Sequence, residues 1–409
     1  MNSMVCCTSS RRRFFGLVAG GAGVFALAAL PGAVFAAVPG DRRFVVVLLR
    51  GALDGMAAVA PVGDPLYQEK RGALALKSPG DGGGTIALDR FFALHPSLAA
   101  IEPYYRRGEL LFVHAAANGY RTRSHFDAQD LMESGLTAKE GESDGWLNRA
   151  IVLLQGGDRA RLGLAVGGAV PLILRGKAEV ASWEPRGIGT LDSDLIAALK
   201  PIYARDSLFG PALAEGIKAQ VFSNAVLGDE AMGKGMGFGP KAFAALADAA
   251  GKLIAAPNGP RIAALDMGGW DTHVNQGAET GRLAQNLEGF AAGLDALAKA
   301  MGPAWRKTAV VAVTEFGRTV AVNGNNGTDH GTASVLFIMG GAVRGGRVAG
   351  DWPGLAKLQD DRDLHMTTDS RAVMKAVLRD HFGVDRKALD TRIFPATAGL
   401  RPFDGLLRA

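Results

Sequence analysis

Phe44-Val45-Val46-Val47-Leu48-Leu49 is an unbroken apolar run, rich in valine, in a chain of 409 residues. A strand with one face in water would alternate apolar and polar residues. This run therefore predicts a strand buried on both faces, as in a parallel sheet covered by helices. Polar and glycine-containing sequence, Arg50 to Gly55, follows at once. Ligands of open α/β sheets bind beyond the carboxyl ends of the strands, so the residues after this run are candidates for a ligand site.

The same pattern recurs along the chain. Four further apolar runs have the length of strands: Leu110 to Val113, Arg261 to Leu265, Thr308 to Val313 and Ser334 to Met339. Three stretches have helical character: Pro96 to Arg107, Arg282 to Met301 and Thr368 to Phe382. Strands alternating with helices predict an α/β fold with a mostly parallel central sheet flanked by helices. We expect one such domain over residues 41–409, with residues 150–260 as an inserted cap, because that stretch has no acid–histidine motif.

The N-terminus has the features of an export signal. Ser10-Arg11-Arg12-Arg13-Phe14-Phe15 resembles a twin-arginine signature, an apolar run extends from Gly16 to Leu30, and Val34-Phe35-Ala36 offers a small-residue cleavage site. We expect residues 1–37 to be a signal peptide read by the twin-arginine export machinery. The mature protein would then be periplasmic, at the cell surface or secreted, and would not span a membrane. The alternative is an uncleaved anchor, since Phe14 to Val38 is nearly long enough to cross a bilayer.

Removal of this segment leaves a nearly neutral protein. The chain has 45 Lys and Arg against 40 Asp and Glu, and the signal holds three arginines and no acid, so 42 basic residues then face 40 acidic ones. A nucleic-acid-binding protein would carry a basic stripe, which excludes that class of function. Both cysteines, Cys6 and Cys7, lie in the signal, so the mature chain has no disulfide and no thiolate metal site.

Acids and histidines gather next to the predicted strand ends. The candidates are Asp54, Asp271, His273, Glu315, Asp329 and His330. Carboxylates and imidazoles from several strands can converge on one divalent ion, so these residues predict a site for zinc, manganese, calcium or magnesium. Some also have structural readings: Asp54 as a helix N-cap, and Glu315 as an ion-pair partner of Arg318. Their placement at successive strand ends favours the shared site.

A second polar motif is Arg121-Thr122-Arg123-Ser124-His125-Phe126-Asp127. Adjacent serine and histidine rarely form a nucleophile–base pair, and the sharp Gly-x-Ser-x-Gly turn does not match here, so a Ser-His-Asp esterase is disfavoured. With a metal present, Ser124 or Thr122 could be the nucleophile, and Arg121 or Arg123 could hold an anionic group. The alternative is that Ser124 caps a helix from Phe126 to Glu133.

Several motifs together resemble a known family. The twin-arginine start is followed by Leu-Arg-Gly-Ala-Leu-Asp-Gly (49–55), Arg-Ser-His-Phe-Asp-Ala-Gln (123–129), Gly-Gly-Trp-Asp-Thr-His (268–273), Thr-Glu-Phe-Gly-Arg-Thr (314–319) and Thr-Asp-His-Gly (328–331). In this combination the chain is similar to DUF1501, an exported bacterial family known only as a domain of unknown function. That family is grouped with the alkaline phosphatase, sulfatase and phosphoglycerate mutase superfamily. The resemblance extends from about Phe44 to the last helix.

The resemblance implies an alkaline-phosphatase-like fold, divalent metals at the strand ends and a serine or threonine nucleophile acting on phosphate or sulfate esters. By motif, the metal site would take Asp54, Asp271, His273, Glu315 and His330. Asp329 or His330 would replace the histidine ligand that usually follows the strand-end acid. Ser124 would match the nucleophile region.

One residue departs from the superfamily pattern. Phe316 stands where a metal-binding histidine usually follows the strand-end acid. Two functions are therefore expected. The first is a metal-dependent hydrolase of a small anionic ester, with Arg123 or Arg318 stabilising charge on the transferred group. The alternative is a non-catalytic relative that serves as a periplasmic or cell-surface binding or assembly protein.

Overall fold

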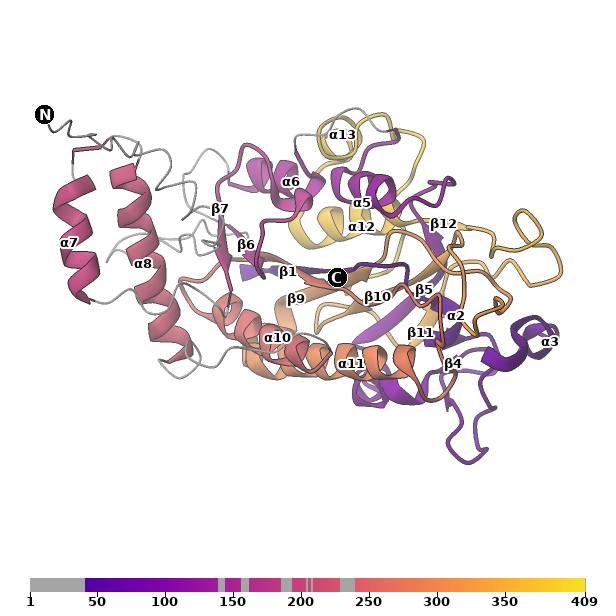
Figure 1. Ribbon diagram of the computed structural model, residues 1–409. Helices are drawn as coiled ribbons and strands as arrows, with labels where there is room; N and C mark the ends of the chain where they lie inside the picture. The colour runs from indigo at the N-terminus through magenta and orange to yellow at the C-terminus, as the bar shows by residue number, and fades with distance from the viewer. Residues whose placement is uncertain are drawn as a thin grey trace, which may run out of the picture.

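A nine-stranded sheet forms the centre of the protein, with helices on both of its faces (Figure 1). The computed structural model describes residues 41–138, 144–155, 162–184, 193–203, 205–206, 209–228 and 240–408. The expected signal peptide, residues 1–37, lies outside these residues. No helix among the described residues combines the length and the apolar character that crossing a bilayer requires.

The strand order confirms an α/β fold with a mostly parallel sheet. Across the sheet the strands are β11 (Arg347–Ala349), β5 (Leu110–Ala117), β10 (Ser334–Met339), β9 (Thr308–Val313), β1 (Arg43–Leu49), β8 (Ile262–Met267), β6 (Gly163–Val166) and β7 (Val180–Trp183), and β12 (Thr368–Asp369) pairs with β5. All pairings are parallel except those of β10, which runs antiparallel to β5 and to β9. The amino end of β10 therefore lies at the same edge as the carboxyl ends of its neighbours.

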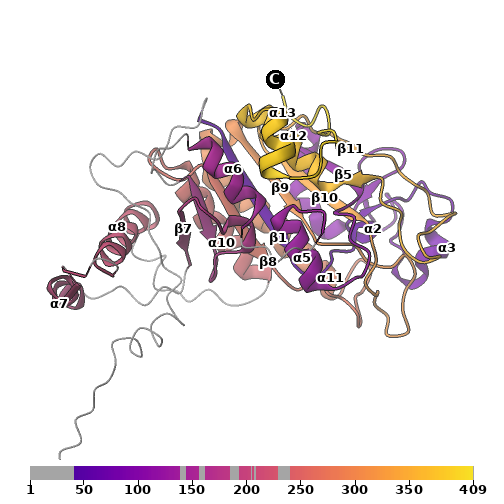
Figure 2. The same ribbon diagram turned by 90° about the horizontal axis from the view of Figure 1, so that it is seen from above.

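Strand β1 is buried on both faces, which explains its unbroken apolar sequence. Val45, Val47 and Leu49 pack into one hydrophobic core, whereas Phe44 and the other alternate residues pack into a second core across the sheet. Helices α10 (Pro240–Ala255) and α11 (Arg282–Met301) cover the first face. Helices α5 (His125–Ser134), α6 (Trp146–Leu154) and α12 (Ser370–Phe382) lie on the opposite side (Figures 1 and 2). Full burial of one Val or Leu side chain contributes roughly 1.5–3 kcal/mol, so both layers stabilise the sheet.

The remaining elements are short or peripheral. A small antiparallel sheet consists of β2 (Val59–Ala60), β4 (Ala93–Leu94) and β3 (Ile86–Ala87). The other helices are α2 (Gly55–Ala58), α3 (Tyr67–Arg71), α4 (Glu102–Arg106), α7 (Ser193–Tyr203), α8 (Phe209–Leu227) and α13 (Arg386–Ala388). Short 3-10 or π helices span Gly72–Leu74, Pro96–Ile101, Leu172–Leu174, Gly302–Lys307 and Leu389–Ile393.

The structure refines three expected elements. Residues 150–260, expected as an inserted cap, contribute strands β6 and β7 to the main sheet, while α7 and α8 lie beyond its edge (Figure 1). The last helix begins at Ser370 and not at Thr368, because Thr368–Asp369 pairs with β5 and the Asp369 side chain caps the helix. The expected helix from Pro96 to Arg107 is a 3-10 turn followed by the short α4.

Candidate metal centre

Three histidines and one aspartate meet at the carboxyl edge of the sheet. His125 is the first residue of α5, in the segment after β5, and Asp271 and His273 follow β8. His330 precedes β10. Because β10 is reversed, residues before it lie at the same edge as residues after its parallel neighbours. We call His125, Asp271, His273 and His330 the histidine cluster.

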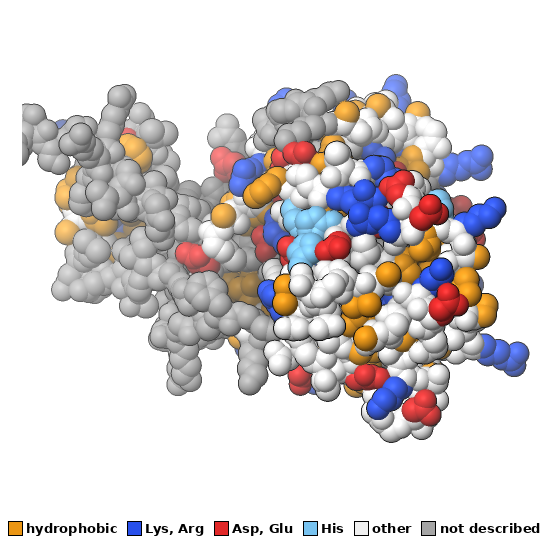
Figure 3. All heavy atoms as spheres, turned by 45° about the vertical axis from the view of Figure 1, so that its right-hand side comes forward, with side chains coloured by type: hydrophobic (Ala, Val, Ile, Leu, Met, Phe, Trp, Pro, Cys, Tyr) orange, Lys and Arg blue, Asp and Glu red, His pale blue; other side chains and the backbone are white. Residues whose placement is uncertain are grey.

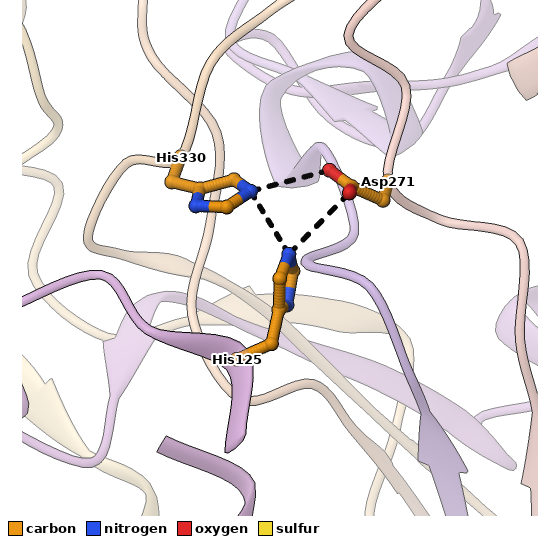
Figure 4. A group of neighbouring side chains, drawn as sticks. All are labelled: His125, Asp271 and His330. Carbon is orange, nitrogen blue, oxygen red and sulfur yellow. Dashed lines mark hydrogen bonds and ion pairs between the residues drawn. The ribbon is translucent and has the colours of Figure 1, made fainter. Parts of the chain in front are cut away.

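The imidazoles of the cluster point at one another through their Nε2 atoms. His330 Nε2 lies 2.9 Å from Nε2 of His125 and 2.9 Å from Nε2 of His273. The Asp271 carboxylate completes the cluster, with Oδ1 3.0 Å from His273 Nε2 and 3.3 Å from His330 Nε2. Its Oδ2 atom lies 3.5 Å from His125 Nε2 (Figure 4). Ligand atoms of His125, Asp271 and His330 all lie within 4.8 Å of one another.

The opposite ring nitrogens each face an acceptor that has no proton to give. His125 Nδ1 lies 2.7 Å from Glu315 Oε1, and His273 Nδ1 lies 3.1 Å from Asp329 Oδ1. His330 Nδ1 lies 2.9 Å from the backbone carbonyl oxygen of Arg123. In a neutral ring, Nδ1 must then carry the proton and Nε2 the lone pair. Metal-binding histidines in proteins are held in this way, with the second N–H donated to a carboxylate or a carbonyl oxygen.

The charge of the site also suits a divalent cation. The carboxylates of Asp271, Glu315 and Asp329 face one guanidinium, that of Arg318, which leaves two negative charges when the rings are neutral. Three nitrogen donors and one carboxylate match zinc and other transition metals better than calcium or magnesium, which prefer oxygen ligands. The residues present therefore fit a zinc-type ion.

The two best-buried imidazoles of the cluster have pKa values that move in opposite directions. The hydrogen bond from His125 to the Glu315 carboxylate outweighs partial burial and raises the pKa of His125. Burial, together with the neighbouring His125 charge, lowers the pKa of His330. In the absence of a metal, a proton therefore resides preferentially on His125, and His330 presents its Nε2 lone pair toward that proton.

The acids of the site are held in their ionised forms. Burial opposes ionisation of Asp271, but the hydrogen bond and charge of Arg318 Nη1, 2.6 Å from Oδ1, lower the pKa of Asp271. Burial also opposes ionisation of Glu315, yet hydrogen bonds from His125 and Gln129 lower its pKa. A hydrogen bond from Asn323 and the one from His273 lower the pKa of Asp329.

The structure separates the predicted metal-site residues into three groups. Asp271, His273 and His330 converge in the histidine cluster. Glu315 and Asp329 lie behind it, where each accepts a hydrogen bond from a ring Nδ1. Asp54 contacts none of the cluster: its carboxylate accepts from the Ala57 backbone nitrogen at the start of α2, from Arg71 and from Gln276.

The predicted charge-stabilising arginines already have carboxylate partners. Arg123 Nη2 lies 2.7 Å from Asp363 and 2.6 Å from Asp360, while the backbone carbonyl oxygen of Arg123 binds the ring of His330. Arg123 has a left-handed backbone conformation, with φ of 61°. Arg318 is buried against Asp271.

Ser124 occupies the N-cap position of α5, directly before His125, but its side chain makes no capping hydrogen bond. The helix begins at His125, one residue before the expected start. The backbone of Ser124 accepts the first helical hydrogen bond, from Ala128. The serine hydroxyl is thus beside the cluster in sequence without being used to hold the helix.

Phe316 forms an apolar wall of the site. Its ring centroid lies 4.9 Å from that of His125 and 5.2 Å from that of His330, and its side chain is buried. His125 is a member of the cluster although sequence reasoning did not select it as a ligand. The signal was present in the Arg-Ser-His-Phe-Asp motif, where the histidine stands among polar residues after a predicted strand.

Solvent reaches the cluster from one face. Side-chain exposure is 22% for His125, 37% for His273 and 26% for His330. Figure 3 shows histidine side chains gathered on that face, with acidic side chains beside them and basic side chains to one side. The cluster is therefore partly exposed to solvent.

Comparison with known proteins places this site within a described family. The profile of a family described as "Protein of unknown function (DUF1501)" matches residues 115–391, a range that contains every residue of the histidine cluster. No curated protein matches the chain. Among solved structures, the phosphonate monoester hydrolase of Agrobacterium radiobacter is similar at 11% identity, with a TM-score of 0.38, over 84% of this chain and 74% of that chain.

Proposed function

The chain belongs to the DUF1501 family of unknown function, as its motifs predicted, and we propose that it is a metal-dependent hydrolase of phosphate or sulfate esters. The observation that carries the proposal is the convergence of three Nε2 atoms and the Asp271 carboxylate, with each Nδ1 bound to an acceptor. Without a metal, the one proton on His125 faces the Nε2 lone pair of His330, and the Nε2 atom of His273 and the Asp271 carboxylate face the same point. A bound divalent ion would take the place of that proton and complete the site.

The residues of the chain have distinct roles in this proposal. His125, His273, His330 and Asp271 hold the ion. Glu315 and Asp329, together with the Arg123 carbonyl oxygen, fix the ring orientations through the three Nδ1–H groups. When bound, the ion would supply a Lewis acid that polarises an ester oxygen and favours deprotonation of a hydroxyl.

The nucleophile would be the Ser124 hydroxyl or a water molecule. Support for Ser124 comes from its place next to His125 and from the absence of a capping hydrogen bond from its side chain. Phe316 would exclude water from one side of the His125 and His330 rings. Arg318 keeps Asp271 ionised and leaves Oδ2 free of its guanidinium.

We further propose that the protein works outside the cytoplasm after export by the twin-arginine pathway. The support is the arginine-rich start of the chain and the apolar run after it. N-terminal sequencing of protein recovered from the periplasm tests this. A start near Ala37 or Val38 is expected, whereas an intact N-terminus in the membrane fraction would favour an anchor.

A second candidate function is metal-stabilised binding or assembly without catalysis. The observation that favours it is the engagement of both predicted charge-stabilising arginines. Arg123 is bound by Asp360 and Asp363, and Arg318 is bound by Asp271, so neither guanidinium is free to hold an ester anion. An ester would then rely on the ion alone for charge stabilisation.

One experiment separates the two functions. The mature protein, purified without chelators and loaded with zinc or manganese, is screened against phosphate and sulfate esters beside Ser124→Ala. Hydrolysis by the wild-type protein that falls at least 100-fold in Ser124→Ala, with metal content unchanged, is expected if Ser124 is the nucleophile. Metal binding without hydrolysis by any metal form would support the second candidate, and a folded protein that binds no metal would contradict both.

A further inference from the structure

A buried chain of hydrogen bonds connects Asp54 with the histidine cluster. The Asp54 carboxylate has no exposed surface, and its Oδ2 accepts from Arg71 Nη2 at 2.6 Å and from Gln276 Nε2 at 2.7 Å. Gln276 is also fully buried. Neither Asp54 nor Gln276 contacts the cluster directly. Hydrogen bonds such as these are needed to keep an ionised carboxylate in the interior of a protein.

Asp54 fixes the orientation of the Gln276 amide. An ionised carboxylate only accepts hydrogen bonds, so the NH2 group of Gln276 must face it and the amide oxygen must point the other way. That oxygen accepts from two buried hydroxyls, Thr272 Oγ1 at 2.7 Å and Thr328 Oγ1 at 2.7 Å. One side-chain oxygen therefore holds two threonines.

The two threonines belong to the two loops that carry most of the cluster. Thr272 lies between Asp271 and His273, and Thr328 lies two residues before His330. The Thr328 backbone nitrogen also donates to the Thr272 carbonyl oxygen at 3.1 Å. The two loops thus meet at Gln276 Oε1, and this side-chain contact adds to backbone hydrogen bonds that also join them, from Asn275 N to the Asn325 oxygen and from Gln276 N to the Asn326 oxygen.

The same contact extends to Asp271 through Arg318. The Thr328 hydroxyl donates its proton to Gln276, so its lone pairs are free to accept from Arg318 Nε, 3.0 Å away. Arg318 Nη1 in turn donates to Asp271 Oδ1 at 2.6 Å. In each hydrogen bond of this series it is fixed which group donates and which accepts, because arginine only donates and the carboxylates only accept.

We propose that Gln276, held by Asp54, is a positioning residue: by fixing the Thr272 and Thr328 hydroxyls, and Arg318 through Thr328, it sets the orientation of the ligands on the two ligand-bearing loops of the metal centre. Asp54 then acts on the centre through Gln276 and not as a ligand. The inference rests on the proposed metal site. It predicts that the side chain of Gln276, which touches no ligand atom of the cluster, controls metal affinity.

The test compares metal binding by the full mature chain and by variants in which Gln276 or Thr328 is replaced. Dissociation constants for zinc and cobalt are measured by competition with a chromophoric chelator, and the visible spectrum of the cobalt-loaded protein reports the ligand geometry. Gln276→Met keeps the side-chain length and removes both hydrogen-bonding atoms. Its affinity should fall about 10–100-fold, the usual effect of losing a partner that orients metal ligands, and its cobalt spectrum should change.

Two further variants separate positioning from general stability. Asn148→Leu removes another buried amide, whose partners are backbone groups of Leu174 and Ala178. It should lower the melting temperature without changing the dissociation constant. Thr328→Val removes one hydroxyl of the series and should weaken metal binding, whereas Thr328→Ser keeps the hydroxyl and should retain the wild-type affinity. This pair tests the inference even if Gln276→Met fails to fold.

The outcomes distinguish this inference from the proposed function. One outcome is that the wild-type protein binds zinc and that folded Gln276→Met and Thr328→Val have the same affinity and cobalt spectrum as the wild type. This outcome would overturn the positioning role of Gln276 but would still support the metal site. Wild-type protein that binds neither zinc nor cobalt would overturn both. Weaker binding in both variants, with Asn148→Leu unaffected, is the expected result.

Discussion

The buried carboxylate of Glu315 lies 2.7 Å from Nδ1 of His125, and it turns the Nε2 atom of that ring toward His330 and Asp271. The same Glu315 oxygen accepts from the Gly51 backbone nitrogen at 2.9 Å. One acid at the end of β9 therefore joins the loop after β1 to the histidine that begins α5. This is how residues far apart in the chain come to form one site.

Glu315 should control metal affinity through His125. In Glu315→Ala the ring loses the acceptor that fixes its Nδ1–H, and we expect zinc to bind about 10–100-fold more weakly. Glu315→Gln keeps an oxygen that can accept from His125 and should lose less. Competition titrations of both variants check this. Equal affinities in Glu315→Ala and the wild-type protein would show that His125 does not need its carboxylate partner.

Gly51 should be required for the loop after β1 to lie close to the loop after β8. Its φ is 117°, and a Cβ atom there would lie 2.6 Å from the backbone nitrogen of Asp271. Gly51→Ala should therefore lower stability by about 1–3 kcal/mol and displace Asp271, weakening metal binding. Gly80→Ala is the matched control, since Gly80 also has positive φ, of 97°, but open space around it. Thermal melts and zinc titrations of both variants decide whether the close contact matters.

The metal-free protein should lose stability in acid through two buried histidines. Burial lowers the pKa of His114 to about 4 and that of His381 to about 4. Unfolded histidine has a pKa near 6.5, so each ring contributes stability that is complete above about pH 6.5 and is lost as the pH falls toward 4. The loss should reach on the order of 3 kcal/mol for each ring.

Substitution of His114 tests that acid sensitivity. His114 Nε2 lies 2.9 Å from the Val59 carbonyl oxygen, and Gln retains a donor for it. Urea unfolding of His114→Gln, with a chelator present, should show a smaller fall in the free energy of unfolding between pH 6.5 and pH 4 than in the wild-type protein. An identical fall would mean that His114 is not the source of the acid sensitivity.

Metal binding should stabilise the folded chain. A ligand that binds only the folded state at 100 times its dissociation constant adds about 2.7 kcal/mol to the free energy of unfolding. We expect zinc to raise the melting temperature of the wild-type protein and to leave that of His330→Ala nearly unchanged, because His330 Nε2 contacts both other rings. A zinc effect of the same size in both proteins would point to binding elsewhere.

Much of the fold could be predicted because burial leaves a direct trace in the sequence. After the first residue of each strand, β1, β9 and β10 are apolar, since helices cover both faces of the sheet. The reversal of β10 could not be predicted, because an antiparallel strand buried on both faces has the same composition as a parallel one. That reversal is what brings His330 to the ligand edge.

The site could be predicted in residue types but not in roles. The sequence placed Asp271, His273 and His330 near strand ends, and these converge. It could not show that Glu315 and Asp329 would bind ring Nδ1 atoms, because a carboxylate one residue past a strand can face the ion or a histidine. These choices depend on side-chain geometry, which only the folded structure fixes.

The most direct test of the metal site is elemental analysis of the mature wild-type protein and of His125→Ala, purified without chelators and again after incubation with zinc. Within the described part of the chain, one group of three or more His, Cys, Asp or Glu side chains has closely spaced ligand atoms. We therefore predict about one equivalent of a transition metal in the wild-type protein and a large loss in His125→Ala. Folded wild-type protein that holds no metal, even after incubation with zinc, would contradict the metal centre.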